Sequence, residues 1–328
     1  MKILYYPDNN GVNEYSNRFK SILNKVGNVE GTSSKKIVKD IINFRVWTHD
    51  YIFVNWLESG LINKNGRFSL HGFAKCCLKL LLFKMTAKNT IYVRHNVYPH
   101  AVIDKDVKKA KYYTDLLESL CDKSLVHSPT ITGEQRVYIP HPLYQSVIIK
   151  KDLINNKPSR SYVFFGRITR YKKLDELIKH IPSDVQLTIA GSCDDEEYLH
   201  YLKELAPDNV HVKGGFISDP DAHALIESSQ GLIIAHADSD MIVSGSFFYA
   251  LSIGVRVLCV ESDFLRWAEQ ILGNDILVCY KSIVDLGGDL SALPQRKKFD
   301  ENLQVLINEQ FGDEAILTAI NDKIITRV

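Results

Sequence analysis

The feature that most constrains the fold is an alternation that runs along the whole chain. Short runs of β-branched and aromatic residues alternate with longer stretches of helical periodicity. This pattern is typical of α/β proteins with parallel sheets. A polar, proline-bearing stretch at residues 150–160 (KKDLINNKPSR) interrupts the alternation and predicts an interdomain linker. The length agrees with two domains, because 328 residues is about twice the usual domain size.

We therefore expect a Rossmann-like domain over residues 1–150 and a second Rossmann-like domain over residues 151–300. Residues 301–328 have a helical pattern and are expected to return to the first domain. Strands are predicted at Lys2–Tyr6, Tyr51–Trp56, Thr90–Arg94, Ser124–His127, Arg136–Ile139, Tyr162–Phe165, Gln186–Ala190, Val210–Lys213, Gly231–Ala235, Arg256–Val260 and Ile276–Cys279. Two doubly wound sheets facing across a cleft would bind a ligand at the carboxyl ends of their strands.

Composition excludes some classes of function. The formal net charge is +1, so the basic excess that accompanies nucleic-acid binding is absent, and no nucleic acid is expected as a partner. The N-terminal MKILYYPDNN enters a strand without an apolar signal core, and the longest apolar run is too short to span a bilayer. The six cysteines lack zinc-ligand spacing. These features predict a cytoplasmic protein with reduced thiols.

The strongest local motif is FGRITRYKKL at residues 165–174, which follows a predicted strand and opens a predicted helix. Gly166 permits close approach of the backbone to a ligand, and Arg167 and Lys172 are expected to converge beyond the strand end. A departing diphosphate develops negative charge, which two fixed cations would stabilise. The alternative is a pair of solvated basic residues in a loop.

A second motif, DSDMIVSGS at residues 238–246, precedes an apolar helix. Ser244 or Ser246 can cap that helix, and Gly245 would let an anion approach its free amides. Asp238 is predicted to bind the same ligand as Ser244, Gly245 and Ser246. Asp238 and Asp240 resemble a metal-binding pair, but such pairs are common by chance in loops, and no metal is predicted.

The first domain offers candidates for a general base. Deprotonating a substrate hydroxyl requires a carboxylate or an imidazole, and Glu58, His95 and His100 follow predicted strands. Either histidine is equally well explained as a buried, satisfied side chain. Polar or aromatic residues at the same strand ends are expected on the acceptor side: Asn10, Gly11, Trp56 and Asn96.

Together these segments resemble bacterial glycosyltransferases of the group 1 superfamily, which have the GT-B fold. GRITRYKK resembles the superfamily's G-R-x-x-x-x-K-G element, with Arg167 and Lys172 at the positions that hold the donor diphosphate. The resemblance places the Gly215–Phe216 turn near the nucleotide base. The largest branch carries two glutamates where this chain has Met241 and Tyr249, so inversion at the anomeric carbon is favoured over its retaining mechanism.

The sequence pattern SGS…ALSxG resembles more closely that of exopolysaccharide and O-antigen transferases, such as β-mannosyltransferases of xanthan-type pathways. Those enzymes resemble the first domain too, with a His-Trp-Pro-Glu-like segment (here residues 55–58) and a His-Asn-x-x-Pro-His segment (here residues 95–100); Asn55 and Leu57 depart from the first pattern. The resemblance implies a UDP- or GDP-linked sugar donor, no cofactor, and a lipid-linked or oligosaccharide acceptor in surface polysaccharide synthesis.

Two alternative functions stay open from the sequence. A sugar-nucleotide epimerase of the same fold would consume donor without an acceptor, and a non-catalytic protein would bind nucleotide or glycan without turnover.

Residues 73–88 (FAKCCLKLLLFKMTAK) mix lysines with leucines and phenylalanines, which predicts peripheral contact with an anionic membrane at its inner face. A core-packing helix with outward lysines explains the same pattern equally well.

Overall fold

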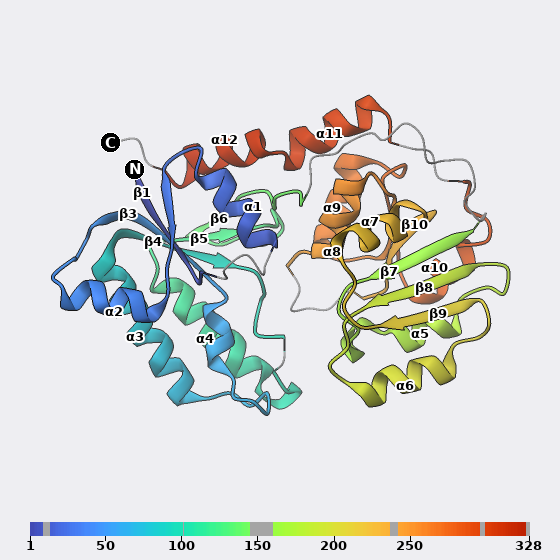
Figure 1. The fold of residues 1–328 in the computed structure, drawn as a ribbon, viewed down its shortest axis with the longest axis horizontal. Coiled ribbons are helices and arrows are strands. Elements are labelled where there is room, and N and C mark those ends of the chain that lie inside the picture. The colour runs from blue at the N-terminus through green and yellow to red at the C-terminus, as the bar shows by residue number, and fades with distance from the viewer. Residues whose placement is uncertain (9–13, 101, 145–159, 237–241, 296–298, 326–328) are drawn as a thin grey trace. The chain divides into compact units, whose positions relative to one another are not determined.

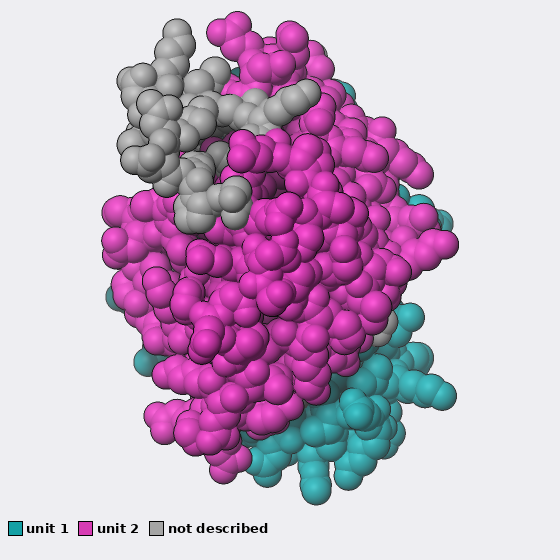
Figure 2. All heavy atoms as spheres, turned by 90° about the vertical axis from the view of Figure 1, so that its right-hand side faces the viewer, with its two compact units in different colours: residues 1–142, 239–243, 311–328 teal, residues 143–238, 244–310 magenta. Residues whose placement is uncertain are grey.

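The computed structural model describes residues 1–8, 14–100, 102–144, 160–236, 242–295 and 299–325. The chain divides into two compact units (Figure 2). Unit 1 comprises Met1–Pro142, Ser239–Val243 and Phe311–Val328, and unit 2 comprises Leu143–Asp238 and Ser244–Gln310. The linker predicted at residues 150–160 lies outside the described residues except for Arg160.

Unit 1 is built on a parallel six-stranded sheet in the order β2-β1-β3-β4-β5-β6 (Figure 1). Its strands are β1 (Lys2–Tyr6), β2 (Asn28–Gly31), β3 (His49–Asn55), β4 (Ala87–Arg94), β5 (Lys123–Val126) and β6 (Arg136–Tyr138). Parallel strands need crossover connections, and helices supply all of them here except the connection from β5 to β6, where residues 127–135 form no helix. The strand order reverses at β1 and β3, and ligands of such sheets bind beside the carboxyl ends of the strands at this switch point.

Unit 2 also has six parallel strands, in the order β12-β11-β10-β7-β8-β9 (Figure 1). They are β7 (Ser161–Phe165), β8 (Gln186–Gly191), β9 (Val210–Gly214), β10 (Gly231–Ile234), β11 (Val257–Val260) and β12 (Leu277–Tyr280). Numbered from β7, this is the dinucleotide-fold order 3-2-1-4-5-6. The switch point therefore lies between β7 and β10, and the loops that follow these two strands carry both sequence motifs.

Twelve α-helices and three short 3₁₀ helices connect and flank the strands within the described residues. The α-helices are α1 (Glu14–Leu23), α2 (Ser34–Ile42), α3 (Leu70–Thr86), α4 (Val107–Ser119), α5 (Leu174–Lys179), α6 (Glu196–Leu205), α7 (Asp219–Glu227), α8 (Gly245–Ile253), α9 (Asp263–Leu272), α10 (Ile283–Asp289), α11 (Glu301–Phe311) and α12 (Asp313–Lys323). The 3₁₀ helices are η1 (Leu57–Leu61), η2 (Asp104–Asp106) and η3 (Arg170–Lys172). Several helices begin at a side-chain cap; Ser69, for example, accepts the amide of Gly72. Each such cap stabilises by about 1 kcal/mol.

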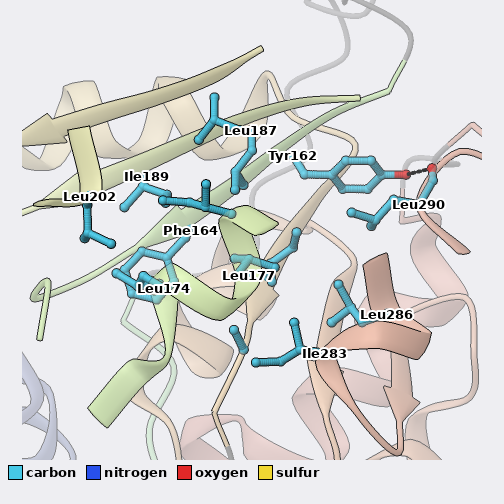
Figure 3. Packing of buried hydrophobic residues seen from close by; sticks show 14 of the residues in the cluster. Tyr162, Phe164, Leu174, Leu177, Leu187, Ile189, Leu202, Ile283, Leu286 and Leu290 are labelled. Carbon is cyan, nitrogen blue, oxygen red and sulfur yellow. Dashed lines mark hydrogen bonds between the residues drawn. The ribbon is translucent and has the colours of Figure 1, made fainter. Parts of the chain in front are cut away.

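Each unit has its own apolar core. In unit 2, side chains of β7 and β8 pack against α5, α6 and α10 (Figure 3). Phe164 and Leu177 lie at its centre, and the Tyr162 hydroxyl donates to the carbonyl of Leu290 at 3.1 Å. In unit 1, Leu80 and Phe83 of α3 pack beneath β3 and β4. Burying one such side chain contributes about 1.5–3 kcal/mol, so these clusters stabilise each sheet with its helices.

The last helix, α12, packs on α1 of unit 1. Asp313 at its start forms ion pairs with Arg18 at 2.7 Å and with Lys25 at 3.1 Å. At its other end, the ammonium of Lys323 donates to the carbonyl of Tyr138 at 3.0 Å. Both ends of α12 are thus held by unit 1.

The predicted strands are confirmed to within three residues at each end; the largest difference is at β4, which begins at Ala87 rather than at Thr90. Neither β2 nor α2, between α1 and β3, was predicted from the sequence, because Asn28–Gly31 (NVEG) lacks an apolar run. The helix α7 begins with Ser218 as its cap, and Asp219 and Pro220 lie in its first turn. No helix in the described part of the chain is long and apolar enough to cross a membrane.

Candidate functional site

Glycines end three neighbouring strands of unit 2. The amide of Gly166, after β7, donates to Ala190 at 3.1 Å, and the amide of Gly215 donates to Gly191 at 3.0 Å. Gly166 and Gly191 have φ values of +138° and +147°, a region that side-chain-bearing residues avoid. A Cβ on Gly191 would lie 2.0 Å from the Gly166 carbonyl oxygen. Backbone therefore packs on backbone at this edge of the sheet.

Lys172 lies against this glycine edge. Its side chain is 8% exposed, and its Nζ lies 3.2 Å from the point that a Cβ on Gly166 would occupy. The hydroxyl of Ser246, from the first turn of α8, lies 3.3 Å from the same point and donates to the Phe165 carbonyl at 2.9 Å. The two predicted motifs therefore meet at Gly166, on either side of the switch point.

The Lys172 ammonium is buried, and the described residues supply no counter-ion for it. Among the described residues it has no ion pair or hydrogen bond; it lies 5.2 Å from the ring centroid of Phe164 and 5.9 Å from that of Tyr171. Burial, with a smaller contribution from Arg167, lowers the pKa of Lys172 to about 8. A buried cation is costly unless an anion compensates it. This position is consequently suited to an anionic ligand.

Arg167 has a different setting from Lys172. Its side chain is 66% exposed and pairs with the exposed carboxylate of Asp194 at 3.5 Å. A pair of this kind is weak and readily exchanged. The cation is close enough to lower the pKa of Lys172. Arg167 is thus available to a ligand at the Lys172 position, although the two side chains do not form one buried cluster.

The start of α8 differs from the predicted serine cap. Ser244 occupies the cap position and is buried, but neither its side chain nor that of Ser246 makes a capping hydrogen bond among the described residues. The prediction of a side-chain cap is wrong, because the Ser246 hydroxyl is directed to the Phe165 carbonyl instead. Gly245 begins the helix, and a Cβ there would lie 3.1 Å from the hydroxyl oxygen of Tyr144. A helix start with uncapped amides favours an anion.

Other donor-side predictions are more exposed or fall outside the described residues. Phe216 is 92% exposed, and Gly215 faces open space. Asp238 lies outside the described residues. Tyr249, at the position of the second family glutamate, stacks on Phe165 with ring centroids 5.5 Å apart. An aromatic ring therefore stands beside the Gly166 turn at this position.

In unit 1, His95 and Trp56 lie together at the carboxyl edge of the sheet. Their rings stack with centroids 4.5 Å apart and planes 16° apart. The Asn55 amide donates to the Tyr6 carbonyl at 3.0 Å, which directs its oxygen to His95 Nε2 at 2.9 Å. Nε2 must then carry the proton, and Nδ1 keeps its lone pair. Burial and the nearby His127 hold the pKa of His95 well below its usual value, so the ring is neutral near pH 7.

Two further histidines, not singled out by the sequence analysis, complete this aromatic group. His127, after β5, accepts the Tyr15 hydroxyl at 2.7 Å and contacts the Ile139 carbonyl at 2.9 Å. Burial lowers the pKa of His127 to about 4. The ring of His141 packs against those of Tyr15 and His127, and its centroid lies 5.0 Å from the centroid of each. The signal that could have identified them is their place at a strand end, as for His95: His127 is the last residue of a predicted strand, and His141 lies two residues beyond another.

The buried side chain of Arg94 holds the loop that carries His95. Arg94 is 2% exposed, pairs with Asp115 at 2.6 Å, and contacts Glu118. The other end of its guanidinium donates to the carbonyls of Val97 at 2.7 Å and Asn96 at 3.2 Å. This buried ion network fixes the backbone around His95.

The remaining first-domain predictions do not join this group. Glu58 is 1% exposed and accepts the Tyr92 hydroxyl at 2.7 Å inside the unit 1 core, and burial raises its pKa. His100 is exposed, and Asn96 is half-buried. Asn10 and Gly11 lie outside the described residues. Within the described part of the chain, no group of three or more histidine, cysteine, aspartate or glutamate side chains is placed to hold a metal ion.

Comparison with known proteins finds proteins of similar fold but no family model or curated sequence that matches. Among solved structures, Anabaena HepE in complex with UDP and glucose has a TM-score of 0.65 and 13% identity over 98% of both chains. Sucrose-phosphate synthase from Thermosynechococcus elongatus has a TM-score of 0.62 and 15% identity, covering 88% of this chain and 76% of its own. A glycosyltransferase from Rickettsia africae has a TM-score of 0.58 and 12% identity, covering 98% and 96%. The chain therefore has the fold of these proteins, the two-sheet α/β fold called GT-B.

Proposed function

We propose that the protein is a glycosyltransferase that moves a sugar from a nucleoside-diphosphate donor to a glycan acceptor. The observation that carries the proposal is the buried ammonium of Lys172, which has no counter-ion among the described residues and lies against the Gly166 turn. A diphosphate would compensate this charge at the switch point of unit 2, where ligands of such sheets bind. The structures of similar fold in complex with UDP and glucose, or with UDP-glucose, support a nucleotide sugar as the donor.

In this proposal the donor diphosphate binds unit 2. Lys172, Arg167 and the amides at the start of α8 stabilise the negative charge that develops on the departing diphosphate. Lys172 contributes most, because its charge is already desolvated and fixed. Arg167 exchanges the exposed Asp194 for a phosphate oxygen. These cations do the work that a divalent metal does in other enzymes, so we propose a metal-independent reaction.

We propose His95 as the general base among the three candidates. Its neutral ring keeps the Nδ1 lone pair for the acceptor hydroxyl, while Asn55 holds the Nε2 proton. Trp56, stacked on the same ring, offers an apolar surface for a sugar. Glu58 instead stabilises the core through Tyr92.

The finer proposal concerns the product. We propose that the acceptor is a lipid-linked glycan of bacterial surface polysaccharide and that the sugar is a hexose. We propose inversion at the anomeric carbon, because Tyr249 replaces a glutamate of the resembled retaining branch. We propose that the donor nucleotide is UDP or GDP.

A donor panel tests the function. UDP- and GDP-sugars with glycan acceptors should release nucleoside diphosphate, and NMR of the product should show the anomeric configuration opposite to that of the donor. Arg167→Ala should reduce turnover at least tenfold, and His95→Ala should reduce kcat about a hundredfold or more. Glu58→Gln should keep activity within about threefold. Lys179→Ala, in an exposed position on α5, is the matched control. Donor isomerisation without an acceptor, or nucleotide binding without any turnover, would reject the proposal.

Nucleotide binding should depend on pH in a direction that follows from Lys172. Its folded pKa of about 8 lies below the ordinary 10.5, so the free protein loses this proton as pH rises through 8. A diphosphate binds the protonated form. Affinity for the diphosphate should be constant between pH 6.5 and 7.5 and fall by up to about tenfold per pH unit above pH 8. Calorimetry in buffers of different ionisation enthalpy should detect proton uptake on binding near pH 8. Affinity that is unchanged from pH 7 to 9.5 would contradict this assignment.

A further inference from the structure

Two neighbouring helices of unit 1 expose an unusual mixture of basic and apolar side chains. On α2, Lys35, Val38, Lys39 and Ile42 follow the spacing i, i+3, i+4, i+7 and are all exposed. On α3, which packs beside α2, the exposed residues His71, Ala74, Lys75 and Leu78 follow the same spacing, and Leu70 and Leu81 are exposed too. Figure 1 shows the two helices next to each other. We call this surface, together with Phe44 and Trp47, the α2–α3 face.

Phe44 and Trp47 extend the α2–α3 face beyond the end of α2. Their side chains are 92% and 63% exposed, although both belong to types that are usually buried. Both have left-handed backbone, with φ values of 58° and 49°. Bulky residues adopt this conformation only where the surroundings impose it, and such positions cluster at functional sites.

The backbone around these two aromatic residues is held in place. The Phe44 amide donates to Ile41 at 2.9 Å, and the Trp47 amide donates to Met85 at 2.8 Å. The Trp47 indole donates to the Lys84 carbonyl at 3.0 Å, so the ring rests on the end of α3. The aromatic side chains are thus presented outward by an ordered segment.

The core of unit 1 does not require this surface. The inward faces of the two helices already supply Ile37, Cys76, Leu80 and Phe83, each at most 2% exposed. The exposed fraction of Ile42 is 70%, and those of Leu78 and Leu81 are both 57%. An exposed apolar patch of this kind marks an interaction site.

The positive charge of the α2–α3 face favours an anionic partner. Residues 34–47 and 70–86 contain seven lysines and arginines and one acidic residue, Asp40, whereas the whole chain has a net charge of only +1. Lys35, Lys39 and Lys75 have no ion pair within the described part of the chain. We propose that the α2–α3 face docks on an anionic lipid bilayer, with Phe44 and Trp47 at the headgroup level and the lysines on the lipid phosphates. A second copy of this chain fits poorly, because a two-fold contact would oppose the same positive charges.

The proposal shifts the membrane contact that the sequence predicts at residues 73–88. Part of that segment is buried: Cys76, Leu80 and Phe83 face the core. Its outward side chains join α2 and the Phe44–Trp47 segment, which the sequence analysis did not include. The inference is independent of sugar transfer, since lipid binding is measured without donor or acceptor.

Vesicle co-sedimentation of the full chain tests the proposal. The wild type should bind phosphatidylcholine vesicles that contain phosphatidylglycerol and not vesicles of phosphatidylcholine alone. Phe44→Ala with Trp47→Ala should weaken the partition at least tenfold. Reversing Lys35, Lys39 and Lys75 to glutamate should weaken it at least a hundredfold, because each basic residue near the surface contributes about fivefold.

Matched controls are available on unit 2. Reversing the exposed Lys179, Lys203 and Lys281 changes the net charge equally and should leave vesicle binding within about threefold. Tyr201→Ala and Val305→Ala remove exposed apolar side chains elsewhere and should have no effect. Circular dichroism and the melting temperature establish that each variant folds. Equal binding by all variants, or no binding by the wild type, would overturn the proposal. Dimerisation without lipid that Phe44→Ala abolishes would assign the face to a second copy instead.

Discussion

Replacing Lys172 with methionine should abolish donor use and make the protein more stable. Turnover should fall at least a hundredfold, because the transition state loses its one desolvated cation. Stability should rise by about 1–3 kcal/mol near pH 7, since methionine has a similar volume and carries no charge to desolvate. The sign follows from the pKa, which is lowered from 10.5 to about 8 and is equivalent to at most about 3 kcal/mol. Below pH 8 the folded protein bears the full cost of this buried charge.

The pH dependence of stability separates this effect from ordinary repacking. The unfolded chain keeps the Lys172 proton up to pH 10.5 while the folded chain releases it near pH 8, so this residue's penalty is lost between those values. The stability difference between Lys172→Met and the wild type should therefore shrink as pH rises from 8 to 10. Urea unfolding at several pH values measures it. Lys179→Met, on the exposed surface of α5, should change neither stability nor turnover. A destabilised but active Lys172→Met variant would refute the diphosphate assignment.

Gly191→Ala should be among the most damaging single substitutions in the protein. The new Cβ would lie 2.0 Å from the Gly166 carbonyl oxygen, and the φ of +147° is itself unfavourable for alanine. Because the obstacle is backbone, β7 and β8 must separate at their carboxyl ends. We expect a loss of about 4 kcal/mol or more in the free energy of unfolding, measured by urea denaturation.

Two glycines calibrate this expectation. Gly166→Ala meets only the flexible ends of Lys172 and Ser246, so it should cost less stability and act mainly on nucleotide affinity. Gly288→Ala, in α10, has nothing within 4 Å of its new Cβ and should be neutral or stabilising by up to about 1 kcal/mol. An equal effect of all three substitutions would show that close packing at the strand ends is not the cause.

Strand positions were predictable because parallel strands of this fold are buried on both faces and read as apolar runs. Val163 and Leu258 lie in such runs, and both are buried. The strand β2 lies at the edge of its sheet and has no fully buried residue, so the sequence carries little hydrophobic signal there. The α2 helix that follows was missed with it, although Ser34–Ile42 is amphipathic.

For the site, the sequence identified which loops matter but not the environment of each side chain. Arg167 and Lys172 stand in one loop as equal candidates, yet the 3₁₀ turn that ends at Lys172 buries only that side chain. Glu58 and His95 both follow strands, yet the left-handed backbone of Trp56 leads into the 3₁₀ helix that takes Glu58 into the core. Such differences depend on turn geometry and on partners distant in the chain, as with Asn55 and His95, which a linear pattern does not contain.

The docking of α12 on unit 1 has a consequence for biogenesis. Residues from both extremes of the chain, Arg18 and Asp313, must meet before this part of the molecule is complete. During synthesis, the first half leaves the ribosome long before the helix that covers α1 exists. Unit 2 contains most of the intervening chain and can reach its native structure earlier. Completion of unit 1 therefore waits for translation of residues 313–323, and a premature stop near position 310 would leave that unit without α12.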